Sequence, residues 1–261
     1  MRVEDFGRMD GPVVLFGGPY SNLQALQAMG QVIGESDAIC TGDIVAYGAS
    51  PAETISQFRA MAVPCVAGNC ERQIADGADD CGCGFDEGSA CNILSKGWYP
   101  YALSQCDSDA ANWLGELPEI GVFTHQNRRY AVIHGGATAI NRFIWPSSPD
   151  TVFLEEITAL APLTGKIDGI VSGHSGIAFH RRIDGYQWIN AGVIGLPPHD
   201  ARPETRYAVL DDGEVTIHRL SYDFAEARRA MESAGLTQGY QETLETGIWP
   251  SEDVLPSALR R

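Results

Sequence analysis

The sequence predicts a single α/β domain in which two mixed β-sheets stack face to face, with helices on the outside. Strands and helices alternate through the first third of the chain, which is typical of parallel strands joined by crossover helices. Strands then dominate residues 121–221, which indicates a second sheet. The chain has 261 residues, 44% of them hydrophobic, so it can bury a full core without disulfide bonds.

The first third is predicted to contain three strands and two helices. The strands are the apolar runs at residues 13–16, 37–40 and 64–69. A helix over residues 21–34 begins with a Ser-Asn cap, and a helix over residues 51–62 has a proline in its first turn. This order predicts right-handed crossovers between parallel strands.

The rest of the chain is predicted from turn residues and apolar spacing. Residues 71–106 are rich in Gly, Asp and Cys and lack a sustained period, so we interpret them as a long functional insertion. The later elements are a short helix at 110–120, hairpins at 122–135, 177–192 and 206–223, a helix at 150–161, a strand entering 169–174 and a helix at 223–235. We treat residues 1–261 as one domain, with residues 222–261 as a helical C-terminal extension.

The charge balance excludes some partners. Lys and Arg number 18 and Asp and Glu number 34, so the formal net charge is −16. Such a surface repels duplex nucleic acid and anionic membranes, but a small phosphate-containing ligand can still be drawn to a local metal site. No run reaches the roughly 18 apolar residues of a membrane span, and the first residues do not form a signal peptide. We therefore expect a cytoplasmic protein.

Four predicted strands end in a glycine-flanked polar residue. These residues are Asp43, Asn69, His134 and His174. Because open α/β sheets bind ligands at the carboxyl ends of their strands, the four side chains are candidates for one divalent cation. Mixed nitrogen and oxygen ligands suit zinc, manganese, iron or nickel. Taken singly, such a histidine is more often a hydrogen-bonded turn residue, and Asp43 alone could be a turn residue.

The segments TGDIVAYG, AGNCE, IHGG and SGHSG, in this order, resemble the signature blocks of the calcineurin-like metallophosphoesterases, in their small bacterial branch. The resemblance covers about residues 12–220. It implies a four-layer α/β/β/α sandwich and a two-metal centre that hydrolyses phosphate esters, which would make the protein a hydrolase, in particular a phosphatase.

The sequence departs from this family pattern at one of the two implied metal positions. Gly18 and Tyr20 stand where the family's DxH block has its aspartate and histidine, and Gly176 replaces the second histidine of the GHxH block. The other position keeps Asp43, Asn69, His134 and His174, so we expect a single metal ion bound by these four residues.

The resemblance also suggests residues near the reaction. Cys70 replaces the GNH histidine that is thought to assist the leaving group, and it could be a ligand, a general acid or neither. We assign Cys70, Asn69 and His134 as candidate catalytic residues. Arg72 and Tyr20 are candidate substrate-binding residues, although Arg72 could equally be a surface arginine.

The insertion carries four cysteines: Cys81, Cys83, Cys91 and Cys106. They could hold a structural zinc ion or an iron–sulfur cluster, form a redox-active or disulfide pair, or pack as buried thiols. We expect Cys40 and Cys65 to be core residues. Two functions remain open: a divergent metal-dependent phosphoesterase, or a non-catalytic metal-binding scaffold or sensor with the same fold.

Overall fold

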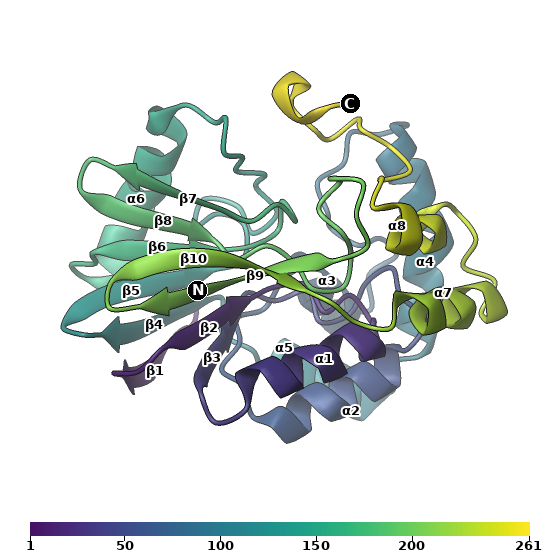
Figure 1. Cartoon of the computed structure of the whole chain (residues 1–261), viewed down its shortest axis with the longest axis horizontal. Coiled ribbons are helices and arrows are strands. Elements are labelled where there is room, and N and C mark those ends of the chain that lie inside the picture. Colours follow the sequence, from purple (N-terminus) through teal and green to yellow (C-terminus); the bar gives the residue numbers. More distant parts are fainter.

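The computed structural model describes residues 1–261 and confirms two mixed sheets between outer helices (Figure 1). One sheet has six strands in the order β1-β4-β5-β6-β8-β7, and the other has four in the order β10-β9-β2-β3. The strands are β1 (Val3–Met9), β2 (Val13–Phe16), β3 (Asp37–Cys40), β4 (Ile120–His125), β5 (Arg128–Ile133), β6 (Gly169–Ser172), β7 (Phe179–Ile183), β8 (Tyr186–Asn190), β9 (Thr205–Asp211) and β10 (Glu214–Leu220).

The helices lie outside the sheets (Figure 1). They are α1 (Leu23–Ile33), α2 (Pro51–Met61), α3 (Asn69–Asp76), α4 (Ala90–Ser104), α5 (Ser108–Gly115), α6 (Asp150–Thr164), α7 (Phe224–Ser233), α8 (Tyr240–Thr246) and a 3-10 turn (Ser257–Leu259). Helix α6 covers the six-stranded sheet, whereas α1, α2, α7 and α8 lie on the side of the four-stranded sheet. No helix is long and apolar enough to cross a bilayer.

Successive side chains of a strand point to opposite faces of its sheet, and this alternation separates the apolar layers. In β2, Val13 and Leu15 belong to the cluster between the two sheets, while Val14 and Phe16 pack with the outer helices. In β5, the alternating residues separate in the same way between the middle cluster and the α6 cluster. Three apolar layers between four structural layers follow directly, which is the α/β/β/α sandwich that the resemblance implies.

Turn residues place the hairpins where the sequence predicts them. Gln126 and Asn127 join β4 to β5 with φ of +47° and +66°, and Asp184 and Gly185 join β7 to β8 with φ of +48° and +85°. Asn and Asp tolerate this left-handed region better than most residues. Asp212 and Gly213 make the third such turn, between β9 and β10.

Two predictions about strands need correction. The predicted strand at residues 64–69 is only an isolated bridge between Cys65 and Cys40. The chain also has a strand that the pattern does not show, β1, which pairs in parallel with β4 at the edge of the six-stranded sheet. Most of β1 is exposed, so its sequence carries no apolar alternation.

The segment 71–106 is not one long loop. Helix α4 occupies most of its second half, and its N-cap, Ser89, accepts a hydrogen bond from the N–H of Asn92 at 3.2 Å. Five small or aromatic residues on one side of α4 are buried: Cys91, Ser95, Trp98, Tyr99 and Ala102. Their spacing is helical, but only two of them are large apolar residues, which explains why the pattern is weak.

Candidate metal centre

The four predicted ligand residues come together at the carboxyl ends of the strands. Asp43 follows β3, His134 directly follows β5, and His174 follows β6, while Asn69 is the first residue of α3. The ligand atoms of Asp43, His134 and His174 all lie within 4.8 Å of one another. Strands β5 and β6 are parallel neighbours in the six-stranded sheet, whereas β3 belongs to the four-stranded sheet, so strand ends from both sheets meet at this site.

His134 lies at the middle of the group. Its Nδ1 is 2.6 Å from the main-chain oxygen of Thr41, so Nδ1 carries a proton and donates it. Its Nε2 lies 3.1 Å from Asn69 Oδ1, 3.3 Å from Asp43 Oδ2 and 3.0 Å from His174 Nδ1. Both oxygens are hydrogen-bond acceptors only, and a single proton on Nε2 cannot make a good hydrogen bond to each of them. One cation, in contrast, would attract these two oxygens and the two imidazole nitrogens together.

The remaining polar atoms are arranged to suit a cation. The Asn69 amide nitrogen donates to the main-chain oxygen of Cys81 at 2.8 Å, which turns Asn69 Oδ1 toward His134. His174 Nε2 is buried and has no hydrogen-bond partner. Two imidazoles, one amide oxygen and one carboxylate are the mixed donor set of transition-metal sites. The residues present therefore fit a divalent ion.

The backbone is constrained at two of these positions. Asp43 and His174 have φ of +56° and +61°, a left-handed conformation that costs free energy for residues other than glycine. Both are buried, with 4% and 7% exposure. Gly68 packs so closely that a Cβ there would collide with the Asp43 carboxylate. The fold holds this geometry despite its cost, which is typical of a functional site.

Glu71 is a residue of the site to which the sequence analysis assigned no role. Its fully buried carboxylate accepts hydrogen bonds from the N–H groups of Asp43 at 2.7 Å, Ile44 at 2.8 Å, Val45 at 3.3 Å and Gly68 at 2.7 Å. It ties the loop after β3 to the start of α3. The signal in the sequence is its place three residues after Gly68 at a helix start, as in a capping box.

Burial and neighbouring charges set the protonation states. Burial, and then the charge of His134, lower the pKa of His174 to about 3. Burial opposes ionisation of Asp43, but the charge and hydrogen bond of His134, together with the charge of His174 and the N–H of Cys70, lower the Asp43 pKa. Burial also acts against His134, yet Asp43 raises the pKa of that ring. A neutral His174 beside an ionised Asp43 is the form that binds metal.

The positions of the second metal in the family pattern hold no ligand set. Tyr20 is buried with 5% exposure, and burial followed by the Asp43 charge raises its pKa well above the ordinary value. A Cβ on Gly18 would lie 2.8 Å from the Tyr20 ring, and one on Gly176 would lie 3.5 Å from Trp249. Aromatic side chains thus surround the space where the missing ligands would stand.

Cys70 lies beside the candidate ligands. Its N–H donates to Asp43 Oδ1 at 3.3 Å, and its Sγ is 3.5 Å from the Asn69 amide nitrogen. Burial raises the pKa of the Cys70 thiol, and the Asp43 and Glu71 charges raise it further. The protein's own groups therefore favour the thiol, and only a bound cation would favour the thiolate.

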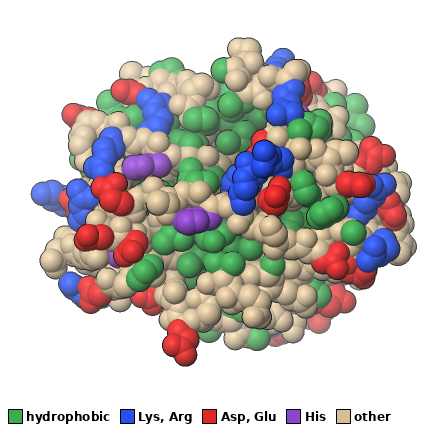
Figure 2. Space-filling model, viewed as in Figure 1, with side chains coloured by type: hydrophobic (Ala, Val, Ile, Leu, Met, Phe, Trp, Pro, Cys, Tyr) green, Lys and Arg blue, Asp and Glu red, His purple; other side chains and the backbone are tan.

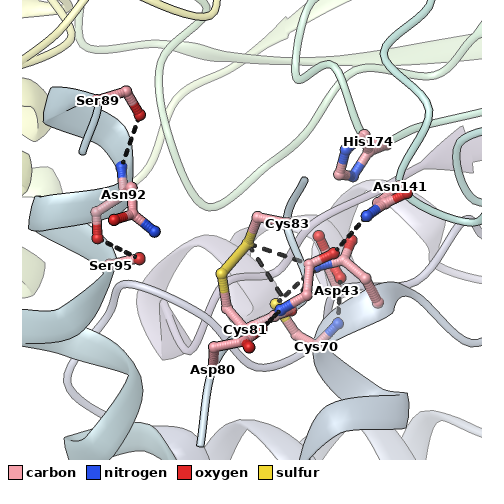
Figure 3. Close-up of a disulfide and its surroundings, with 12 residues drawn as sticks. Asp43, Cys70, Asp80, Cys81, Cys83, Ser89, Asn92, Ser95, Asn141 and His174 are labelled. Carbon is pink, nitrogen blue, oxygen red and sulfur yellow. Dashed lines mark hydrogen bonds between the residues drawn. A yellow bond between two sulfur atoms is a disulfide. The ribbon is translucent and has the colours of Figure 1, made fainter. Parts of the chain in front are cut away.

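A disulfide joins Cys81 to Cys83 next to this group (Figure 3). Figure 3 shows the disulfide between Asp43 and Cys70 on one side and the start of α4 on the other. Cys91 instead lies near Ser251 and Val254, and the sulfur of Cys106 is a separate free thiol. The structure does not bring the four insertion sulfurs together as one zinc or cluster site, because two of them are bonded to each other. Cys40 and Cys65 are buried, as expected.

Of the two candidate substrate-binding residues, one lies elsewhere. Arg72 donates to the main-chain oxygens of Gly115 and Leu117 and lies 3.9 Å from Glu119, so it binds the end of α5 and not the candidate centre. The other, Tyr20, lines a cavity beside Asp43 and His174. The C-terminal extension forms part of the same cavity through Trp249, Pro250, Ser251 and Val254, which no motif in the sequence indicates.

Comparisons with solved structures show the same fold in other proteins. A metallophosphoesterase from Sphaerobacter thermophilus matches with a TM-score of 0.72 at 21% identity, over 92% of this chain and 100% of that one. A hypothetical protein from Pyrococcus horikoshii OT3 matches with a TM-score of 0.74 at 16% identity, over 90% and 98%. At these identities the two structures show the shared fold. No curated protein matches the chain.

A family model describes most of the chain. The calcineurin-like phosphoesterase superfamily domain matches residues 21–213, beginning just after Tyr20 and including all four candidate ligands. The chain therefore belongs to the calcineurin-like phosphoesterase superfamily.

Proposed function

We propose that this protein is a divergent phosphoesterase that hydrolyses a small phosphate ester or nucleotide with a single divalent ion held by Asp43, Asn69, His134 and His174. The observation that carries the proposal is the contact of His134 Nε2 with Asn69 Oδ1, Asp43 Oδ2 and His174 Nδ1 at 3.0–3.3 Å. A fold that binds no metal ion would have no need for this set of atoms. Zinc, manganese, iron and nickel suit such ligands.

The chain's own groups have separable roles in this proposal. A bound divalent ion would acidify a water molecule and withdraw charge from a phosphate oxygen. Thr41 fixes the tautomer of His134, and Glu71 holds the loop that carries Asp43. Cys70 Sγ, buried beside Asp43, is the nearest candidate for a proton donor to the leaving oxygen.

A second function has one specific observation in its favour. Gly18, Tyr20 and Gly176 stand where a two-metal site would need ligands, and aromatic rings occupy that region. A single ion cannot clamp both the attacking and the leaving oxygens. The protein could therefore bind metal as a scaffold or sensor without turnover.

Two measurements separate these functions. The first is the metal content per chain after reconstitution, for the wild type and for His134→Ala. The second is hydrolysis of 4-nitrophenyl phosphate and bis(4-nitrophenyl) phosphate by both proteins. One metal ion per chain with turnover that His134→Ala abolishes supports the phosphoesterase, whereas one ion without turnover supports the scaffold. Protein that takes up no metal would exclude both.

A further inference from the structure

The cavity beside the candidate metal centre is predominantly apolar. About 580 Å³ of space, open solvent included, lies among its 17 lining residues, of which 11 are hydrophobic. Asp43 and His174 lie in its wall, and Phe85, Phe143 and Trp249 contribute aromatic rings. Phe143 packs on His174 with ring centroids 4.3 Å apart, so the apolar wall reaches the candidate ligands. Such cavities bind organic groups by burying their apolar surface.

The cavity also lacks basic side chains. Its lining contains no Lys or Arg, and arginines close to the site loops in sequence are bound elsewhere. Arg72 binds main-chain oxygens near α5, and Arg142 pairs with Glu156 at 2.5 Å. Figure 2 shows a group of basic side chains at the middle of the visible face, next to acidic ones, and other charged side chains interspersed around it. The cavity lining itself therefore offers no basic side chain to a phosphate group, and positive charge there would have to come from a metal ion.

We propose that this cavity binds the apolar ring of a phosphate ester that carries a single negative charge, a phosphodiester with an aromatic group. The proposal rests on the proposed function and defines its substrate class. Asp43 already neutralises one charge of a divalent ion, so the site accommodates a phosphodiester with one charge better than a monoester with nearly two. The aromatic wall then selects for the ring.

Four compounds separate the effects of charge and ring. Methyl phenyl phosphate has a ring and one charge, dimethyl phosphate has one charge and no ring, and phenyl phosphate and methyl phosphate are the corresponding monoesters. Their binding to the metal-loaded protein at about pH 8, where monoesters are close to doubly charged, is measured by calorimetry. We expect methyl phenyl phosphate to bind at least tenfold more tightly than each of the other three.

A variant that fills the cavity tests where the ring binds, and the same kind of substitution at an exposed position is its control. Val254 lines the cavity and is half-buried, so Val254→Trp places a ring where the ligand's ring would lie. Ile217→Trp makes a similar change at an exposed position on β10. Only Val254→Trp should remove the advantage of methyl phenyl phosphate over dimethyl phosphate, while both variants keep their metal content.

The measurements of binding and of turnover can contradict the ligand class and the catalytic function independently of each other. Equal or tighter binding of phenyl phosphate than of methyl phenyl phosphate overturns the charge part of the proposal, even if the protein hydrolyses esters. Equal binding of dimethyl and methyl phenyl phosphate overturns the ring part. If the expected order is found without hydrolysis of any ester, the substrate class stands as a ligand class and the proposed catalytic function fails.

Discussion

The buried carboxylate of Glu71 accepts the N–H of Asp43 at 2.7 Å, and this bond holds the Asp43 backbone in its left-handed conformation. The same carboxylate also accepts from Ile44, Val45 and Gly68. All four partners are N–H donors, so they require a side chain in which both terminal atoms are hydrogen-bond acceptors, as in a carboxylate. We therefore expect metal binding and loop structure to be coupled through this side chain.

We therefore expect Glu71→Gln to destabilise the protein by about 2–4 kcal/mol, because the new NH2 group would face buried N–H donors. Metal affinity should fall as well, since Asp43 would lose its fixed position. The measurement is chemical denaturation of the metal-free protein together with metal titration. Glu35→Gln, at an exposed turn position, should change neither. A Glu71→Gln protein with unchanged stability would contradict this role.

Adding metal should stabilise the wild type. A ligand that binds only the folded state adds about 2.7 kcal/mol at a free concentration 100 times its dissociation constant. His134→Ala should lose most of this gain, because it removes the atom that contacts all three other candidate ligands. The check is the melting temperature with and without Mn²⁺ or Zn²⁺. His218→Ala, an exposed change on β10, should keep the gain; an equal gain in His134→Ala would argue against this site.

The disulfide should influence the same site. Asn69 donates to the main-chain oxygen of Cys81 at 2.8 Å and lies 3.4 Å from the sulfur of Cys83, so the bonded loop orients the Asn69 amide. We expect reduction to weaken metal binding several-fold as the loop gains freedom. Metal titration with and without dithiothreitol measures this. In the Cys81→Ser/Cys83→Ser protein the reductant should have no further effect, and unchanged affinity on reducing the wild type would refute the coupling.

Acid should loosen the C-terminal wall of the cavity. Hydrogen bonds from the Arg261 N–H and from His199 lower the pKa of Glu252. A lowered folded-state pKa contributes stability above the unfolded pKa of about 4.3, and this stability is lost as the pH falls through the folded value. Trp249, which donates to His199, reports the change by its fluorescence or hydrogen exchange. Glu252→Gln should remove the acid-dependent step in this segment, and an unchanged step would contradict the assignment.

Local patterns explain which parts of the fold the sequence predicts. The hairpins follow from Asn, Asp and Gly at their turns, and the layers follow from alternation in strands such as β2 and β5. Strand β1 cannot be predicted from apolar alternation, because it lies at a sheet edge with most residues exposed and is defined by its pairing with β4. Helix α4 has a weak apolar pattern because small residues such as Cys91 and Ser95 share its buried face.

The candidate site likewise has residues that local sequence patterns identify and residues that only tertiary packing brings there. Asp43, Asn69, His134 and His174 can be found from the sequence because each follows an apolar run and stands beside glycine, although the run before Asn69 forms only an isolated bridge. Their role as ligands remains a proposal. The cavity wall could not be predicted, since Trp249 and Val254 reach it only through the tertiary packing of the C-terminal segment. Arg72 is close to Asn69 in sequence, but its side chain binds the main-chain oxygen of Gly115 and does not lie at the site.

Aromatic rings lie next to Gly18 and Gly176, where the family pattern has ligands of a second metal. Gly18 has φ of +45°, and a Cβ there would lie 2.6 Å from Val193 Cγ1 and 2.8 Å from the Tyr20 ring. Gly18→Asp should therefore destabilise the protein by about 2–4 kcal/mol, from steric overlap and backbone strain together. Adding Tyr20→His should recover part of that loss, because the smaller ring relieves one of the two contacts. Denaturation measures both effects, and metal analysis of the double variant should still give one ion per chain, since Gly176 supplies no ligand. A Gly18→Asp protein as stable as the wild type would mean that Tyr20 does not block this position.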